Sequence, residues 1–340
     1  MTLRRVLLLL ASITLGVLFV VVLLRIGKIN LRQTLQQLQS VSRLAFVKLV
    51  LLNGLLIYLS TEKWRCIDVA QRLSSDSVPS RITSFAVTSA GMALGLVLPV
   101  QIGMAAARTL GTYVHGRPLT RGTVGTLLEQ SFDLIIVAFL AGASAVTWFF
   151  RGGALMWTAS ASVMMVLALL AMAPSIRLIR GLGAPCNDGK PAPRNRILLG
   201  FRELQHSSLL NASLARRLVM LSAVRFGVVV LMAAQTAEAI RVHIPLFHMA
   251  AAVPFVAIAT VISVTPGGIG VNELTSVTAL HCFGTPLAVA AQWSVVNRVL
   301  VTASCFTVAA CAAILWAVER IITRTTAAHT KTAEIGLGKC

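Results

Sequence analysis

The chain has 340 residues, of which 56% are hydrophobic and only 12% are charged, a composition that excludes an ordinary soluble domain and indicates the α-helical membrane class. Its formal net charge is +19, from 30 Lys and Arg residues against 11 Asp and Glu residues. Because the bases lie mainly in loops between apolar runs, we attribute this excess to membrane topology and anionic lipid headgroups, and we expect no nucleic-acid partner.

The apolar runs are long enough for helices that cross a hydrocarbon layer of about 30 Å. The first run, residues 6–24, exceeds a normal signal-peptide core and no small-residue cleavage site follows it, so we expect a spanning helix there. The fold class that we predict is all-α, a polytopic membrane protein with about six to eight transmembrane helices. The candidate spans are residues 6–24, 44–60, 82–100, 123–150, 154–173, 218–234, 248–264 and 288–318.

The longest polar interval, residues 174–217, is rich in proline and basic residues and divides the chain into two halves. Within it, residues 196–210 place apolar side chains at helical spacing opposite bases, which predicts a helix lying on the membrane surface. Residues 29–39 show a similar pattern and predict a second surface helix.

A short motif recurs once in each half. LPVQIG at residues 98–103 and TPGGIG at residues 265–270 share P-x-x-I-G, and each follows an apolar run directly. Proline and glycine end helices, so we expect each motif to form the tip of a re-entrant hairpin of two broken helices. Two such hairpins that enter from opposite faces form an inverted repeat with a central site.

The hairpins also decide the topology that we expect. If every apolar run spans, the bases divide almost equally between the two sides; with two re-entrant hairpins, most of them fall on one side. The positive-inside bias then places both termini and the loop 174–217 in the cytoplasm. We therefore expect a membrane domain over residues 1–320, a short cytoplasmic tail over residues 321–340, and a location in the cell's inner membrane.

Charged residues inside the apolar runs are candidates for a functional site. Glu129 and Asp133 are four residues apart on one helix face, and Arg298 lies near the middle of the last run. An isolated charge at that depth costs roughly 3 kcal/mol or more, so we expect Arg298 to pair with at least one of Glu129, Asp133 and Glu273. Two interpretations stay open: a structural ion pair, or an arginine that binds a substrate anion.

Two further arginines and the second tip complete the candidates. Arg108 follows the first tip and is a candidate ligand, whereas we expect Arg225 to extend to the membrane interface. The glycines of the second tip leave backbone N–H groups free to face a polar ligand. The predicted substrate-binding residues are Arg108, Glu129, Asp133, Pro266, Gly267, Gly268, Gly270, Glu273 and Arg298.

Signs of catalysis or metal binding are missing from the sequence. It contains no HExxH, DDxxD, G-x-S-x-G or Walker motif, its six cysteines form no CxxC, and no two of its six histidines are four residues apart. We expect neither a metal site nor a cofactor, and we do not expect an enzyme.

The chain resembles the lysylphosphatidylglycerol synthase transmembrane-region family of flippase-like membrane domains. The resemblance is carried by LPVQIGMAAAR (98–108), LLEQSFDL (127–134), TPGGIGVNE (265–273), VVNR (295–298) and KWR (63–65). In this family an acidic residue commonly follows the first tip, whereas this chain has Met104 and three alanines there. Only about 20 residues follow the last apolar run, so we expect a stand-alone member without the soluble aminoacyl-transferase domain.

The resemblance implies a bacterial flippase or transporter that moves an amphiphile with a polar or anionic headgroup across the bilayer. The lipid partner it implies is a phospholipid, a polyprenyl-linked lipid or a hopanoid-like lipid, and the oligomeric state stays open. Two alternatives remain at this point: a membrane enzyme or accessory subunit of lipid-linked headgroup transfer, and a small-solute or proton-coupled carrier that uses Glu129 and Asp133.

Overall fold

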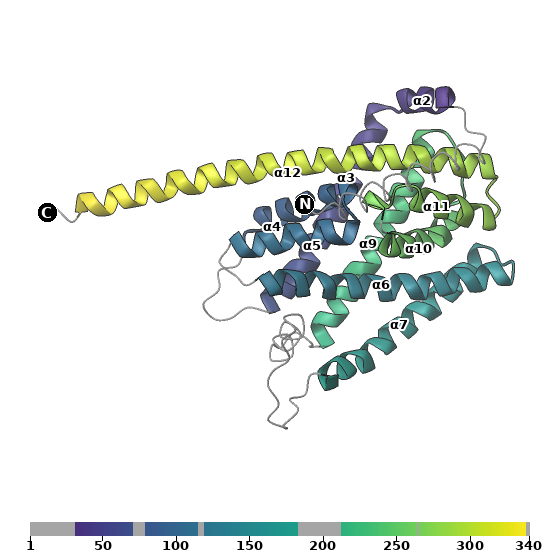
Figure 1. Ribbon diagram of the computed structural model, residues 1–340, viewed down its shortest axis with the longest axis horizontal. Helices are drawn as coiled ribbons and strands as arrows, with labels where there is room; N and C mark the ends of the chain where they lie inside the picture. The colour runs from purple at the N-terminus through teal and green to yellow at the C-terminus, as the bar shows by residue number, and fades with distance from the viewer. Residues whose placement is uncertain (1–30, 71–78, 115–118, 183–211, 264, 338–340) are drawn as a thin grey trace, which may run out of the picture.

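A computed structural model describes residues 31–70, 79–114, 119–182, 212–263 and 265–337, and all regular elements within these ranges are helical (Figure 1). The expected first span and the expected surface helix at 196–210 lie outside them. The elements are α2 (Leu31–Ser40), α3 (Arg43–Ala70), α4 (Arg81–Val97), α5 (Val100–Val114), α6 (Leu119–Phe149), α7 (Ala154–Leu182), α9 (Ala212–Ala239), α10 (Leu246–Ile262), the 3-10 turn η2 (Pro266–Gly268), α11 (Val271–Cys282) and α12 (Leu287–Leu337).

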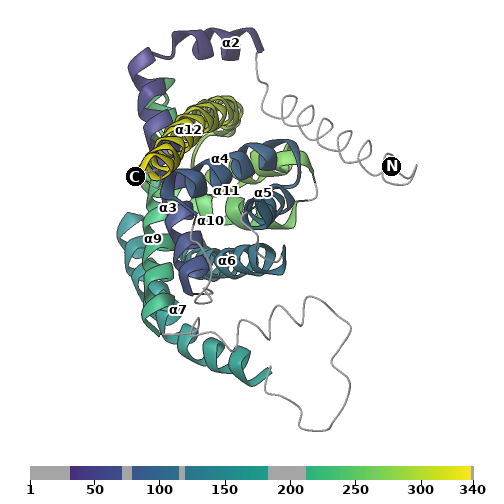
Figure 2. The same cartoon turned by 90° about the vertical axis from the view of Figure 1, so that its left-hand side faces the viewer.

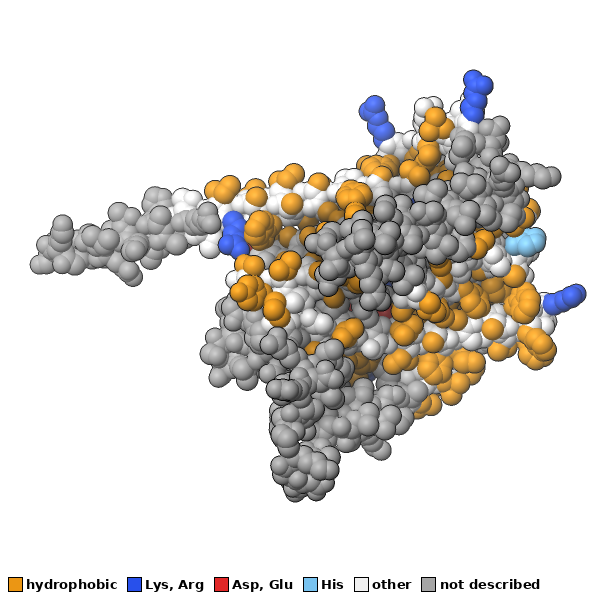
Figure 3. All heavy atoms as spheres, viewed as in Figure 1, with side chains coloured by type: hydrophobic (Ala, Val, Ile, Leu, Met, Phe, Trp, Pro, Cys, Tyr) orange, Lys and Arg blue, Asp and Glu red, His pale blue; other side chains and the backbone are white. Residues whose placement is uncertain are grey.

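Four helices are long and apolar enough to cross a membrane. The qualifying stretches are Arg43–Ala70, Gly122–Phe149, Ser213–Ala239 and Leu287–Thr323, of 27 to 37 residues. At 1.5 Å per residue these stretches are roughly 40 to 55 Å long. Figure 3 shows apolar side chains spread over the displayed face of the molecule, with basic side chains toward the edges of that face. The prediction of an all-α, multi-pass membrane protein is confirmed.

Two pairs of shorter helices form the predicted hairpins. The first consists of α4 and α5, with 17 and 15 residues, and the second of α10 and α11, with 17 and 12 residues. A helix of this length extends only about 18 to 26 Å, too little to cross the hydrocarbon layer alone. In each pair the two helices pack against each other. Between α4 and α5 the backbones approach so closely that a Cβ on Gly103 would lie 2.5 Å from the nitrogen of Gly95.

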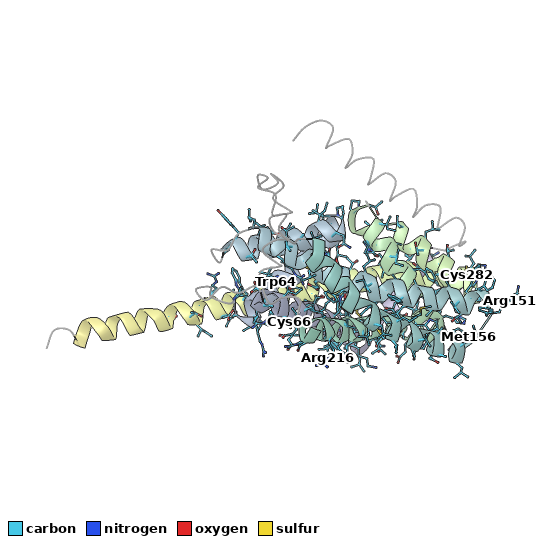
Figure 4. All side chains as sticks on the ribbon, turned by 90° about the horizontal axis from the view of Figure 1, so that it is seen from below. Trp64, Cys66, Arg151, Met156, Arg216 and Cys282 are labelled. Carbon is cyan, nitrogen blue, oxygen red and sulfur yellow. The ribbon has the colours of Figure 1, made fainter. Side chains whose placement is uncertain are left out.

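The two hairpins open toward opposite ends of α6. The first opens where α3 ends and α6 begins, since Arg81 Nε lies 3.8 Å from Glu62 Oε1 and the hydroxyls of Thr109 and Thr123 are 3.0 Å apart. The second opens at the turn between α6 and α7, where a surface hollow is lined by residues of that turn together with the start of α10 and the end of α11. Figure 4 shows Cys282, the last residue of α11, beside Arg151 of that turn. The arrangement is inverted, as the repeat predicted.

The hairpins occupy the centre of the molecule. Figure 2 shows them side by side between α12 and α6, with α3 and α9 along one flank. Buried apolar side chains of α9, α10, α11 and α12 form one core cluster, and those of α3, α6, α7 and α9 form another. At the second tip Thr265, Gly267, Gly268 and Gly270 are buried, so most of its irregular backbone is shielded by the surrounding helices.

Several helix limits differ from the expected ones. The span expected over residues 44–60 continues as α3 to Ala70, and the polar interval 174–217 is shortened because α7 ends at Leu182 and α9 begins at Ala212. The last helix continues to Leu337, so residues expected to form a short tail are helical, and Figure 1 shows α12 extending well beyond the bundle. Hydropathy locates the apolar part of a helix, but polar residues can continue the same helix beyond it.

Candidate functional site

The two hairpin tips meet each other. The N–H of Gly267 in the second tip donates a hydrogen bond of 3.0 Å to the carbonyl oxygen of Leu98 in the first. Pro266 begins η2, and Gly267, Gly268 and Gly270 have φ angles of 57°, 70° and 82°. Residues with a Cβ rarely adopt these angles, so the glycines permit this tight backbone path.

Glu273 and Arg298 hold the second tip in place. The Glu273 side chain accepts a hydrogen bond of 2.5 Å from the N–H of Gly270, and its Oε1 lies 3.6 Å from Arg298 Nε. The arginine is close enough to the tip that a Cβ on Gly267 would lie 2.6 Å from its Nη2. The expected partner of Arg298 is therefore present, and it is Glu273.

A second group of charges lies where α3, α5, α6 and α9 meet. Arg108 forms an ion pair with Glu129 and donates a hydrogen bond of 3.2 Å to the carbonyl oxygen of Ser60. Lys63 Nζ lies 2.5 Å from Asp133 Oδ1 and 3.8 Å from Glu129 Oε1. Glu129 thus contacts two cations, and Lys63 lies between the two carboxylates.

Arg225 completes this charge cluster, and its position is a correction. We expected its side chain at the membrane interface, but its Nη1 lies 3.0 Å from Asp133 Oδ2. An unpaired carboxylate within the bilayer is costly, and a guanidinium on the neighbouring helix α9 relieves that cost. We name the charge cluster by its five members, which are Lys63, Arg108, Glu129, Asp133 and Arg225.

Sequence reasoning missed Lys63 altogether as a site residue. It lies beyond the span expected over residues 44–60, yet α3 continues past it and holds it in the bundle, where it is fully buried. The guanidinium carbon of Arg108 also lies 5.3 Å from the ring centre of the adjacent Trp64, at a distance that suits a cation–π contact. The only sign of this in the sequence was the KWR triplet at residues 63–65.

The charge cluster has a net positive charge. Three basic side chains surround two carboxylates, which leaves one positive charge without an acidic counterpart in the cluster. Arg108 and Lys63 are 1% and 0% exposed, so little water screens this charge. Such a site favours an anion.

A cavity of about 350 Å³ adjoins the charge cluster. Arg108, Glu129, Asp133 and Arg225 form part of its wall, and most of the remaining wall is apolar. The Nε atoms of Arg108 and Arg225 are buried and have no hydrogen-bond partner among the described residues. The cavity thus combines a largely apolar lining with four charged side chains of the charge cluster.

The predicted site residues fall into two neighbouring groups. Arg108, Glu129 and Asp133 line the cavity, whereas Pro266, Gly267, Gly268, Gly270, Glu273 and Arg298 form and support the tip contact and do not line it. Gln101, at the start of α5, and Asn297, next to Arg298, connect the two groups because both line the cavity. In the part of the chain that the structure describes, no group of His, Cys, Asp and Glu residues is arranged to hold a metal ion.

The chain was compared with protein families, curated proteins and solved structures. The model of a family described as lysylphosphatidylglycerol synthase TM region matches residues 9–326, which is nearly the whole chain. No curated protein and no solved structure matches this chain.

Proposed function

Because the chain belongs to the lysylphosphatidylglycerol synthase TM-region family, we propose that it moves a lipid with an anionic headgroup across the membrane. Membership of this family makes it a membrane protein with a lipid-related function. Our proposal that the lipid has an anionic headgroup and is moved across the membrane depends on the cavity. We also propose that the protein carries out no chemical step on the lipid.

The observation that carries the proposal is the cavity beside the charge cluster. A lipid phosphate needs cationic donors that are shielded from water, and Arg108 and Arg225 both belong to the cavity wall. The apolar side chains around the cavity suit the part of the lipid next to the phosphate. A soluble solute would not require this combination of one charged wall and apolar surroundings.

The hairpins supply a means of moving the headgroup. Both tips lie near the centre of the bundle and touch through the Gly267 to Leu98 hydrogen bond. Separation of the tips would open a path between the two faces that the hairpins enter, in the manner of other transporters built from inverted repeats. We propose that the first hairpin enters from the cytoplasm, that both termini are cytoplasmic, and that the protein resides in the inner membrane.

Translocation in reconstituted vesicles tests the proposal. Phosphatidylglycerol with a fluorescent group on one acyl chain is added to vesicles that contain the purified protein, and an impermeant quencher reports the lipid that moves. We expect faster movement than in empty vesicles. In Arg225→Gln the rate should fall at least tenfold, although Asp133 keeps its contact with Lys63 and the fold should persist.

Lys48→Gln is the matched control. Lys48 is also a base within an apolar helix, but it is exposed and lies outside the cavity. It should therefore leave translocation unchanged. Movement no faster than in empty vesicles for any anionic lipid would refute the proposal. Headgroup turnover without movement would instead favour the enzyme, and uptake of a soluble solute driven by a pH gradient would favour the carrier.

A further inference from the structure

The two arginines of the cavity wall are not held equally firmly. Arg108 is only 1% exposed and forms an ion pair with Glu129. It also donates a hydrogen bond of 3.2 Å to the carbonyl oxygen of Ser60, and its guanidinium carbon lies 5.3 Å from the ring centre of Trp64. Moving Arg108 would take the nearest cation from a buried carboxylate, which is strongly destabilising. Arg108 is therefore fixed, and it offers a ligand its positive charge from a constant position.

Arg225 is held less firmly than Arg108. Its Nη1 lies 3.0 Å from Asp133 Oδ2, and the side chains of this pair are 27% and 19% exposed. Both residues line the cavity, so a ligand can approach the pair directly. Breaking a partly exposed ion pair costs far less than breaking a buried one. Arg225 can therefore leave Asp133 for a ligand at a modest cost.

Asp133 keeps a cation when Arg225 leaves it. Its Oδ1 lies 2.5 Å from Nζ of Lys63, which is fully buried and belongs to α3, whereas Arg225 belongs to α9. An unpaired carboxylate within the bilayer is costly, and the contact with Lys63 avoids that cost. The charge cluster can thus release one arginine while both of its carboxylates remain paired.

A phosphate and a carboxylate are alternative partners for the same guanidinium. Each presents oxygen atoms that accept hydrogen bonds from the N–H groups of an arginine, often two at a time. Oδ2 of Asp133 already accepts a hydrogen bond from Nη1 of Arg225, and a phosphate placed beside this carboxylate would be repelled by its like charge. A phosphate that binds Arg225 therefore takes the place of Asp133.

We infer that Asp133 is a built-in competitor of the lipid phosphate for Arg225. When the phosphate binds, Arg225 turns to it and Asp133 stays with Lys63. When Asp133 pairs with Arg225 again, it displaces the phosphate and so promotes release of the lipid. Asp133 is thus a positioning residue, which acts through Arg225 and sets how tightly the headgroup is held. This inference rests on the proposed function, because it takes a lipid phosphate as the anion.

The affinity of Asp133→Asn for phosphatidylglycerol tests the inference. The full chain is purified into nanodiscs, and phosphatidylglycerol with a fluorescent group on one acyl chain is titrated against it. The asparagine keeps the size of the side chain but no longer competes as an anion, so binding should become roughly five- to tenfold tighter. A residue that only held the fold together, or that bound the headgroup itself, would give weaker binding instead.

Two controls separate competition from other effects. Diacylglycerol with the same acyl chains carries no phosphate, so Asp133→Asn should bind it as the unaltered protein does. Glu62→Gln removes a carboxylate of α3 that faces Arg81 at 3.8 Å and lies outside the cavity. It should leave the affinity for phosphatidylglycerol unchanged.

A double-mutant cycle with Arg225→Gln shows whether Asp133 acts through that arginine. In the Arg225→Gln background no guanidinium remains to compete for, so adding Asp133→Asn should change the affinity less than twofold. A general electrostatic effect of the lost carboxylate would persist in that background. In the vesicle assay the single variant Asp133→Asn should also move saturating phosphatidylglycerol more slowly, by about the factor that it gains in affinity, because the phosphate leaves Arg225 more slowly.

The inference is wrong if Asp133→Asn binds phosphatidylglycerol no more tightly than the unaltered protein, or if diacylglycerol gains the same factor. It is also wrong if the double variant binds more tightly than Arg225→Gln by that factor, a comparison that decides the matter even if Asp133→Asn alone fails to fold. Its failure differs from that of the proposed function. Lipid movement without the gain in affinity would refute only the competition, whereas the gain in affinity without any movement would refute only translocation.

Discussion

Replacing Gly267 by alanine tests whether the contact between the two hairpin tips controls transport. Gly267 has a φ of 57°, and an added Cβ would lie 2.5 Å from the carbonyl oxygen of Leu96 and 2.6 Å from Arg298 Nη2. The left-handed backbone conformation costs an alanine about 1 to 2 kcal/mol, and this strain is relieved when the tip unpacks and residue 267 leaves that conformation. Because the carbonyl belongs to the backbone of α4, it cannot move aside as a flexible side chain would.

The expected consequence is a shift toward separated tips. A change of about 2 kcal/mol corresponds to a roughly 30-fold larger population of the open state. Thr265, at the second tip, is only 1% exposed, so a cysteine placed there in a background without other cysteines reacts with a small maleimide only when the tip unpacks. The modification rate should rise by roughly the same factor, and lipid translocation should fall because the tips no longer close.

Gly227→Ala provides the matched control. This glycine lies in α9, and no atom lies within 4 Å of an added Cβ. An alanine there should leave the maleimide rate unchanged and stabilise the helix by up to about 1 kcal/mol. If Gly267→Ala and Gly227→Ala gave the same modification rate and the same translocation, the tip contact would have no part in transport and the reasoning would fail.

Three further predictions concern packing, charge and topology. Arg108→Ala should lower protein abundance sharply, because it leaves Glu129 buried without its main partner at a cost of about 3 to 5 kcal/mol. The double change Arg108→Met with Glu129→Leu removes both charges, so it should restore abundance but not the binding of phosphatidylglycerol. Gly103→Val should reduce the thermal stability of the detergent-solubilised protein because the backbones of α4 and α5 are in contact there, while Gly54→Ala, whose Cβ would meet nothing closer than 4.0 Å, should not. A single cysteine that replaces Lys190 should resist an impermeant thiol reagent in intact cells, and ready labelling would overturn the cytoplasmic placement of the loop 174–217.

The fold could be predicted largely from the sequence because its determinants are local. Apolar runs in lipid must form helices, and a proline with glycines at residues 265–270 must interrupt one. The recurrence of P-x-x-I-G, combined with the side on which the bases gather, predicted two hairpins that enter from opposite faces. The structure has both hairpins, and they open toward opposite ends of α6.

The site could be predicted only in part. Arg298 had to find an acid, since an isolated charge in the bilayer is costly, but three acids were available and the sequence did not choose among them. Lys63 was not among the predicted site residues because it lies beyond the apolar run 44–60, and Arg225 was expected at the interface because a long side chain can extend there. Both are members of the charge cluster.

The sequence by itself determined the helical membrane class, the two broken hairpins and the presence of buried charges that require partners. The tertiary structure decided which charges pair and that one cluster contains more cations than carboxylates. It also decided that amides from α5 and α12 line the same cavity as the arginines of α5 and α9. The physical reason is that hydropathy and helix breaking depend on neighbours along the chain, whereas the partner of each charge depends on how the packed helices are rotated and shifted against one another.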